Sequence, residues 1–210
     1  MRNICYTFAV EMITQKDNNK IMTRLAIFVS GGGTNCENII RYFQGNPEVE
    51  VPVVVSNKSD AYAIVGAKNL GIPTTVITRQ QLNEDRQLVM DTVSGCDFII
   101  LAGFLPKVPE YLINEFPNRI INIHPALLPK YGGKGMWGHH VHEAVKAAGE
   151  TETGITIHYV NTELDAGEQI AQFSTALSPD DTPDDIADKV HVLEMAHFPK
   201  VIEQVIRGEK

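Results

Sequence analysis

Short apolar runs alternate with amphipathic segments along most of the chain of 210 residues. Residues 24–30 form a continuous apolar run that ends at glycines, which is typical of a buried parallel strand. Similar runs recur, and the segments between them repeat apolar residues with a helical period of about 3.6 residues. The further predicted strands are residues 49–57, 72–78, 97–103 and 119–125. The predicted helices between them are residues 37–45, 60–71, 81–93 and 108–116.

Strands and helices in this order predict a parallel sheet wound by right-handed crossovers. The C-terminal part differs, because residues 153–160 alternate apolar and polar positions, as a half-buried strand does, and residues 168–177 form a returning strand. A long helix follows, with Thr182 as its cap, Pro183 in its first position and Pro199 as a kink or break. The predicted fold class is therefore α/β: a Rossmann-like, mostly parallel twisted sheet with helices on both faces and an antiparallel C-terminal edge.

The chain length suits one domain. Residues 1–21 are expected to form an N-terminal extension, and residues 22–210 a single domain, because a polar stretch at 17–20 precedes the first convincing strand. The apolar piece near the N-terminus is interrupted by Glu11 and lacks a small-residue cleavage site, so it does not resemble a signal peptide.

Composition narrows the expected partners and compartment. The net charge of −8 repels nucleic-acid phosphates and anionic lipid, so neither nucleic acid nor a membrane is an expected partner. A small anionic substrate in a local positive pocket remains compatible with this charge. The three cysteines are far apart and form no CxxC pair, which predicts a reduced, cytoplasmic protein without disulfides or a thiolate zinc site.

A glycine-rich loop, Ser-Gly-Gly-Gly-Thr-Asn at residues 30–35, joins the first predicted strand to the first helix. Glycines let the backbone approach a ligand closely, and the N-terminus of the following helix offers free N–H groups to an anion. A dinucleotide fingerprint would need a glycine where Cys36 stands, and the Lys-Ser/Thr of a Walker loop is absent. The loop therefore favours a single phosphate, with Thr34 and Asn35 able to add side-chain bonds. A tight turn without a ligand is the alternative.

Asn122 and His124 stand two positions apart at the end of the fifth predicted strand. Side chains at i and i+2 of a strand project to the same side, and Pro125 ends the strand. The pair would then lie at the carboxyl edge of a parallel sheet, where α/β proteins bind ligands. An amide and a protonated imidazole side by side can stabilise a developing oxyanion. A buried polar pair bonded to backbone groups is the alternative.

Asp165 lies in an expected tight turn with Ala166 and Gly167. A carboxylate beside a histidine favours the charged imidazole and fixes its orientation. A turn-forming aspartate is the ordinary alternative, and spacing alone does not bring Asp165 to His124.

Three histidines, His139, His140 and His142, form a further cluster. Pairs one or two positions apart do not share a helix face, and no zinc-protease motif is present. A partly exposed loop and helix start is the preferred interpretation, and a metal site is the alternative.

Taken together, these motifs resemble those of a known family. The segments AIFVSGGGTN, LAGFLPKV, INIHPALLPKY, GITIHYV and ELDAGEQI follow the order seen in phosphoribosylglycinamide formyltransferases, from Arg24 to Arg207. The pattern Asn-x-His-Pro-x-Leu-Leu-Pro with a downstream Asp-x-Gly is highly specific for the folate-dependent formyltransferase superfamily. Formyltetrahydrofolate hydrolases carry an N-terminal regulatory domain and methionyl-tRNA formyltransferases a C-terminal RNA-binding domain, and we expect neither in this chain.

The resemblance implies an enzyme of purine biosynthesis. It would transfer the formyl group of 10-formyltetrahydrofolate, as co-substrate, to the amine of glycinamide ribonucleotide, without a metal. The implied partners are these small molecules, and the implied assembly is a monomer or a homodimer. Two alternatives stay open: a formyltetrahydrofolate hydrolase, and a non-catalytic module that binds folate or a sugar phosphate.

The resemblance also implies roles for individual residues. The catalytic set would be Asn122, His124 and Asp165. The substrate phosphate and ribose would contact Gly33, Thr34, Asn35, His191, Val192, Leu193 and Glu194. The folate would contact Asn122 and Asp165 together with Leu105, Pro106, Lys107, Val108, Asn161, Thr162, Glu163 and Leu164. At Lys107 the local match to the family is imperfect, and either Arg79 or Arg86 would be the folate-contacting arginine.

One segment departs from the family pattern. Residues 132–142 are longer than the loop that closes over the folate in the family, and they include Trp137. We expect this loop either to reshape the lid over the folate or to serve a subunit contact.

Overall fold

The computed structural model describes residues 22–208. The predicted N-terminal extension at residues 1–21 lies outside the described residues and stays a prediction.

Within residues 22–208, seven strands form one sheet in the order β3-β2-β1-β4-β5-β6-β7. The first five strands pair in parallel, whereas β6 is antiparallel to β5 and β7 is antiparallel to β6. The strands are β1 (Thr23–Val29), β2 (Val49–Ser56), β3 (Thr74–Val76), β4 (Phe98–Leu101), β5 (Ile120–His124), β6 (Glu152–Tyr159) and β7 (Gln169–Ala176). This topology confirms the predicted fold class, including its antiparallel C-terminal edge.

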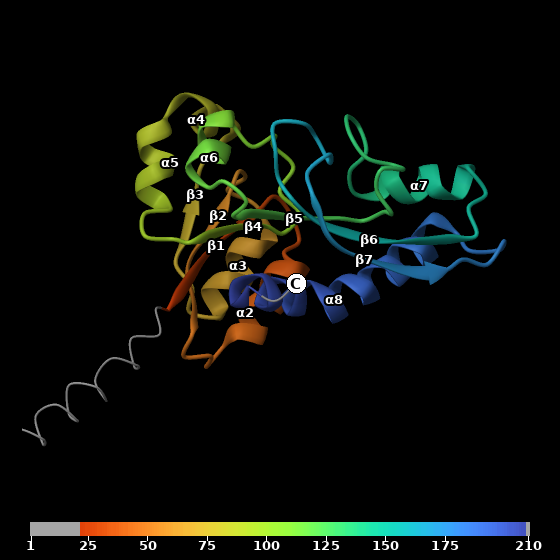
Figure 1. Cartoon of the computed structure of the whole chain (residues 1–210), viewed down its shortest axis with the longest axis horizontal. Coiled ribbons are helices and arrows are strands. Elements are labelled where there is room, and N and C mark those ends of the chain that lie inside the picture. Colours follow the sequence, from red (N-terminus) through yellow and green to blue (C-terminus); the bar gives the residue numbers. More distant parts are fainter. Residues whose placement is uncertain (1–21, 209–210) are drawn as a thin grey trace, which may run out of the picture.

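Helices cover both faces of the sheet (Figure 1). One core joins the sheet to α2, α3, α7 and α8, and a second core joins the opposite face to α4, α5 and α6. The helices are α2 (Thr34–Phe43), α3 (Tyr62–Asn69), α4 (Arg79–Glu84), α5 (Arg86–Thr92), α6 (Glu110–Glu115), α7 (His139–Ala147) and α8 (Pro183–Arg207). The continuous apolar run of β1 fits this arrangement, because Ile27 faces the first core and Phe28 the second.

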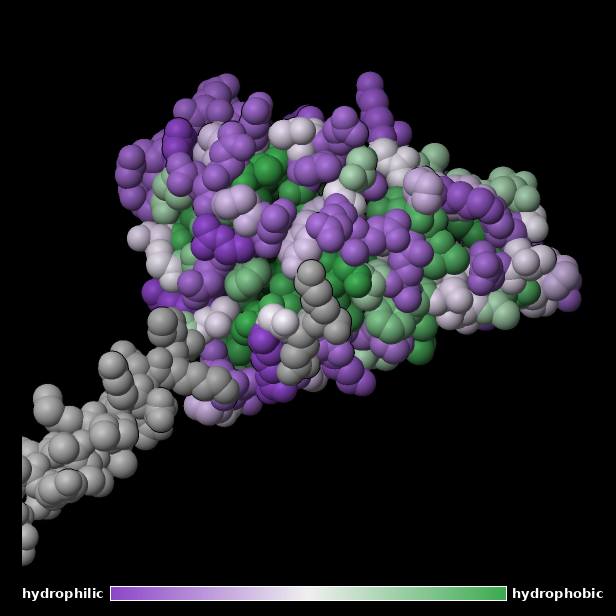
Figure 2. All heavy atoms as spheres, in the orientation of Figure 1, coloured by the Kyte–Doolittle hydropathy of each residue, from purple (hydrophilic) through white to green (hydrophobic). Residues whose placement is uncertain are grey.

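Polar side chains cover the outer surfaces of α4, α5 and α6, whereas apolar residues show through the middle of the same view (Figure 2). This distribution is expected of amphipathic helices that bury one side against a sheet. Among the described residues, no helix combines the length and the apolar character needed to cross a bilayer.

Two predicted details are wrong. The single helix expected at residues 81–93 is divided into α4 and α5, because Asp85 leaves the helical conformation (φ −111°, ψ 71°) and its side chain accepts a hydrogen bond from the Leu88 N–H. The expected half-buried strand, β6, is buried on both faces from Thr153 to His158. The side that carries the polar residues does not face solvent. Thr156 Oγ1 on that side donates to the Ala126 carbonyl and accepts from the Leu128 N–H.

Pro199 does not break α8, which runs without interruption from Pro183 to Arg207. A proline inside a helix leaves the carbonyl four residues earlier without its usual donor, and here that carbonyl belongs to Met195. Asn38 of α2 supplies the donor, with Nδ2 at 3.0 Å from the Met195 carbonyl oxygen. The same bond joins α2 to α8 beside the loop at residues 30–35. The predicted cap at Thr182 and first position at Pro183 are confirmed.

Candidate active site

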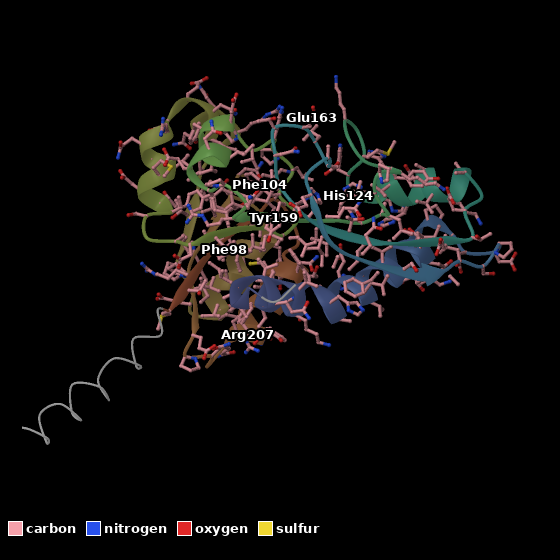
Figure 3. All side chains as sticks on the ribbon, viewed as in Figure 1. Phe98, Phe104, His124, Tyr159, Glu163 and Arg207 are labelled. Atoms are coloured by element: carbon pink, nitrogen blue, oxygen red, sulfur yellow. The ribbon has the colours of Figure 1, made fainter. Side chains whose placement is uncertain are left out.

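A cleft of about 1130 Å³ opens at the carboxyl edge of the parallel strands. Its walls come from the loops after β1, β4 and β6, the end of β5, the loop before α7 and the first half of α8. The three predicted catalytic residues, Asn122, His124 and Asp165, all line it. His124 at the end of β5 lies close to the loop that carries Glu163, between β6 and β7 (Figure 3). The cleft therefore joins segments that lie far apart in the sequence.

Asn122 is held by a residue that the sequence analysis missed, His158. The two are cross-strand partners of β5 and β6, and Asn122 Nδ2 lies 3.1 Å from His158 Nε2. His158 Nδ1 lies 2.9 Å from the Tyr159 carbonyl, to which it can only donate, so Nε2 accepts from the amide. Burial lowers the pKa of His158, which favours this neutral form. Asn122 makes no other side-chain hydrogen bond within residues 22–208, so its second N–H is available to a ligand.

His124 is 4% exposed. Its Nε2 donates to the Tyr131 carbonyl oxygen at 2.7 Å. Because Nε2 carries that hydrogen, Nδ1 is the nitrogen that receives or donates the second proton. Nδ1 lies 3.7 Å from Asp165 Oδ1, which is too long for a direct hydrogen bond but within ion-pair distance when the imidazole is protonated.

The structure brings Asp165 to His124, which sequence spacing could not establish. Asp165 has a left-handed backbone (φ 54°), and its Oδ2 accepts the Gly133 N–H at 2.8 Å. Its Oδ1 lies 3.7 Å from His124 Nδ1 and 3.8 Å from His158 Nε2. The turn is closed by Asn161, whose Oδ1 accepts the Glu163 N–H at 2.9 Å and whose Nδ2 donates to the Ala166 carbonyl at 3.2 Å. One carboxylate thus faces both histidines.

The glycine-rich loop lies in the same cleft and ends at the N-terminus of α2. Gly33 has φ +85°, and a Cβ atom there would come within 2.5 Å of the Ala63 Cβ, so both its conformation and its packing require glycine. The side-chain amide of Asn35, the last residue of the loop, is bonded to α8. It donates to Glu194 Oε2 at 3.0 Å, and its own Oδ1 is buried without a partner among the described residues.

Glu194 therefore links the loop to α8. Burial raises the pKa of Glu194, against the lowering effect of its hydrogen bonds with Asn35 and His191. His191 Nδ1 lies 3.5 Å from Glu194 Oε2, and both residues line the cleft. The Val192 and Leu193 side chains do not line it. Val192 is 66% exposed, and Leu193 packs against the core, because positions i and i+3 of a helix share a face that the two positions between them do not.

The loop after β4 is fixed to the glycine-rich loop through Ser30. The Ser30 hydroxyl donates to Asn57 Oδ1 at 2.5 Å and accepts the Leu105 N–H at 2.9 Å. All four predicted folate contacts in this loop line the cleft: Leu105, Pro106, Lys107 and Val108. Lys58, which the sequence analysis did not single out, also lines the cleft and forms no ion pair within residues 22–208. The sequence does indicate this position, because Lys58 comes directly after β2, next to the strand that leads into the glycine-rich loop.

The structure separates the two candidate arginines. Arg79 lines the cleft, whereas Arg86 does not. Arg86 instead forms an ion pair with Glu115 and lies over the Tyr111 ring, 5.7 Å from its centroid. In the turn after β6, the predicted residues Asn161, Glu163 and Leu164 line the cleft and Thr162 does not.

The histidine cluster is divided by burial. His139 and His140 are exposed, and His140 Nδ1 lies 3.1 Å from Glu143 Oε2. His142 is buried and lines the cleft, and burial lowers its pKa to about 4. Within residues 22–208, no group of three or more histidine, cysteine or acidic side chains is arranged to hold a metal ion.

The long segment at residues 132–142 is a loop only up to Gly138, because α7 begins at His139, and it contributes Gly133 to Gly138 to the cleft wall. Trp137 is 51% exposed and packs edge to face on His140, with ring centroids 4.9 Å apart. The loop follows a cis peptide bond between Leu128 and Pro129. Its position at the cleft is compatible with a lid, which stays a prediction.

The sequence and the fold are both similar to those of known formyltransferases. The formyl transferase family model matches residues 23–202. The chain is 40% identical over 174 residues to the chloroplastic phosphoribosylglycinamide formyltransferase of Arabidopsis thaliana, a match that covers 80% of this chain and 60% of the plant protein. It is 33% identical over 195 residues to the phosphoribosylglycinamide formyltransferase of Haemophilus influenzae, with 89% of each chain covered. The chain thus spans about 60% of the length of the plant relatives that it matches.

Two solved structures show the likeness in three dimensions. The phosphoribosylglycinamide formyltransferase of Anaplasma phagocytophilum has a TM-score of 0.80 at 32% identity, with 90% of this chain and 89% of that chain covered. The enzyme of Coxiella burnetii, in complex with CHES, has a TM-score of 0.80 at 36% identity, with the same coverage of 90% and 89%.

Proposed function

The chain belongs to the formyl transferase family, and on this premise we propose that it transfers the formyl group of 10-formyltetrahydrofolate to the amine of 5-phosphoribosylglycinamide. The products are N-formylglycinamide ribonucleotide and tetrahydrofolate, in purine biosynthesis. The observation that carries this proposal is the convergence of Asn122, His124 and Asp165 in one cleft with a glycine-rich loop at a helix N-terminus.

The two substrates would bind from opposite walls of the cleft. The phosphate would accept backbone N–H groups at Gly33, Thr34 and Asn35, where α2 begins, with Lys58 as a nearby cation. Glu194 and His191 on α8 would contact the ribose. The folate would lie between the loop at residues 105–108 and the turn at residues 161–165. A cleft of about 1130 Å³ is large enough for both molecules.

The catalytic groups would act on the formyl carbonyl. The substrate amine attacks the formyl carbon, and negative charge develops on the formyl oxygen. Asn122 donates its second N–H to that oxygen, and His124 in its protonated form donates through Nδ1. Asp165 faces the imidazolium and can take up the amine proton through a water molecule. The tetrahedral intermediate then collapses: the bond between the formyl carbon and the folate nitrogen breaks, and that nitrogen leaves with the proton that the amine has given up. Because the two donors and the carboxylate are held in place by His158, Tyr131 and Gly133, little reorganisation is needed during the reaction.

Absorbance at the wavelength where 10-formylfolates and their deformylated products differ tests the proposal. We expect conversion that depends on added glycinamide ribonucleotide. If formate were released equally fast with and without the ribonucleotide, the chain would be a hydrolase instead. Binding of both ligands without any turnover would identify a non-catalytic module.

Arg79 is proposed as the folate-contacting arginine. Arg79 forms no ion pair within residues 22–208 and lines the cleft, so it can meet the carboxylates of the folate. We expect Arg79→Ala to raise the KM for 10-formyltetrahydrofolate by about tenfold, because the substitution removes one charge-assisted hydrogen bond to the folate. Arg86→Ala is the matched control and should leave this KM unchanged. The reverse pattern in steady-state kinetics would contradict the assignment.

Trp137 is expected to report folate binding. Trp137 is the single tryptophan of the chain and lines the cleft wall, so its fluorescence should change when a folate fills that wall. The measurement is a fluorescence titration with a non-reactive formyl-folate analogue. Ribonucleotide alone, bound at the opposite wall, should produce a smaller change. A signal indifferent to saturating folate would count against a lid role for residues 132–142.

The compartment, the assembly and the domain boundaries stay proposals. Cys36 and Cys96 are free and buried, which agrees with a reduced compartment such as the cytoplasm. We propose a single catalytic domain at residues 22–210 that acts on small molecules as a monomer or homodimer.

A further inference from the structure

One turn positions both proposed catalytic partners. In the turn Lys130 to Gly133, the Tyr131 carbonyl accepts from His124 Nε2 at 2.7 Å, and the Gly133 N–H donates to Asp165 Oδ2 at 2.8 Å. Tyr131 has φ 56°, in the left-handed region that non-glycine residues occupy only when neighbouring contacts hold them there. The direction of the Tyr131 carbonyl therefore depends on whatever restrains this residue.

Glu150, in the connection between α7 and β6, anchors the Tyr131 side chain, whose ring also packs against the core. Its Oε1 accepts from the Tyr131 hydroxyl at 2.8 Å and from Lys130 Nζ at 2.8 Å. Both hydrogen bonds lower the pKa of Glu150, so the carboxylate stays charged. Glu150 does not line the large cleft, so it touches neither substrate there. It borders a separate cavity of about 260 Å³ behind the turn, together with Lys130 and Tyr131.

We propose that Glu150 is a positioning residue for formyl transfer. It acts through Tyr131, whose carbonyl fixes His124 as the tautomer with hydrogen on Nε2 and so directs Nδ1 toward Asp165 and the cleft. This inference rests on the proposed function for its kinetic consequence. The claim that Glu150 fixes the His124 tautomer through Tyr131 does not depend on the proposed function.

The other groups around His124 do not substitute for the Tyr131 carbonyl. Asp165 lies on the Nδ1 side, and His142 Nδ1 is buried without a hydrogen-bond partner among the described residues. If Tyr131 relaxes to an ordinary backbone conformation, its carbonyl turns and Nε2 loses its acceptor. The imidazole is then free to exchange tautomers and to rotate, which misplaces the donor by a distance on the scale of 1 Å. Displacements of that size cost up to roughly 10²-fold in rate.

Three variants test the proposal kinetically. Glu150→Ala should lower kcat about 10- to 100-fold while the KM for the ribonucleotide stays unchanged. Glu150→Gln should restore most of the rate, because the amide oxygen still accepts both hydrogen bonds. Glu152→Ala is the matched control: it removes an exposed carboxylate two residues away, at the start of β6, and should behave as the unmodified chain.

Nitrogen-15 NMR of the His124 imidazole gives a measurement that would not change if Glu150 contributed only to the stability of the fold. At a pH high enough to remove the proton from Nδ1, the unmodified chain and Glu150→Gln should show a single neutral tautomer protonated at Nε2, and Glu150→Ala an exchanging mixture of tautomers. Tyr131→Phe, which removes one hydroxyl only, should change the spectrum in the same direction if Glu150→Ala does not fold. A single Nε2-protonated tautomer in Glu150→Ala, or an unchanged kcat in that folded variant, would overturn the proposal. If the unmodified chain lacks transfer activity but the tautomer still depends on Glu150, the proposed function fails and the positioning role stands.

Discussion

His124→Ala is expected to lower kcat about 10²–10³-fold, the usual cost of losing one preorganised oxyanion donor. His124 is the only one of the three proposed catalytic groups that can both donate to the oxyanion and carry a positive charge. Its side chain is fixed on one side by the Tyr131 carbonyl and faced on the other by Asp165. Removing it leaves Asn122 as the remaining donor. The KM for the ribonucleotide should change little, because the glycine-rich loop and Glu194 are separate from His124.

Steady-state kinetics with both substrates measure this effect, and thermal unfolding shows whether the variant is folded. His140→Ala is the matched control, since His140 is exposed on α7 and lies outside the proposed catalytic set. Near-normal turnover in a folded His124→Ala variant would remove His124 from the mechanism.

Asp165→Asn should lower kcat about 10²–10⁴-fold, the range observed for general acid–base groups. The substitution keeps the shape of the side chain, and the remaining oxygen can still accept the Gly133 N–H. It removes the negative charge that lies 3.7 Å from His124 Nδ1 and 3.8 Å from His158 Nε2. Without that charge no carboxylate faces His124 Nδ1, and none is available to take up the amine proton. The loss should therefore appear in kcat with the fold preserved.

Asp180→Asn is the matched control for this substitution, because Asp180 is exposed in the loop before α8. Single-turnover experiments separate the chemical step from product release. If Asp165→Asn retained turnover within about threefold of the unmodified chain, Asp165 would be a turn-forming residue only.

The pattern of apolar residues was sufficient to predict the sheet and the placement of Asn122 and His124. β1 and β5 are continuous apolar runs because helices cover both sheet faces, and the strand period of two places Asn122 and His124 on one side. The capping and proline signals at Thr182 and Pro183 also identified the start of α8. These features are determined by residues that lie close together in the sequence, so the sequence is enough to predict them.

Features that depend on contacts between distant segments could not be predicted in this way. His158 was missed because the alternation in β6 suggested a solvent-facing side, whereas that side is covered by the segment from Ala126 to Leu128. α8 continues through Pro199 because Asn38 of α2 bonds the unpaired Met195 carbonyl. The approach of Asp165 to His124 likewise depends on the turn that contains Gly133.

Some of the segments that the resemblance implied as binding residues line the cleft only in part. The resemblance implied His191, Val192, Leu193 and Glu194 as one segment, but helix geometry directs only the first and last into the cleft. The choice between Arg79 and Arg86 also required the structure, since an ion pair with Glu115 occupies Arg86.

Isotope-labelled substrates test the central claim, direct transfer in this cleft, most directly. Carbon-13 in the formyl group of 10-formyltetrahydrofolate and nitrogen-15 in the amine of glycinamide ribonucleotide can be followed together by NMR. The account predicts a product whose formyl carbon shows one-bond coupling to the amine nitrogen, formed by the unmodified chain and nearly abolished in His124→Ala. Appearance of the carbon label as free formate while the ribonucleotide remains unformylated would contradict it.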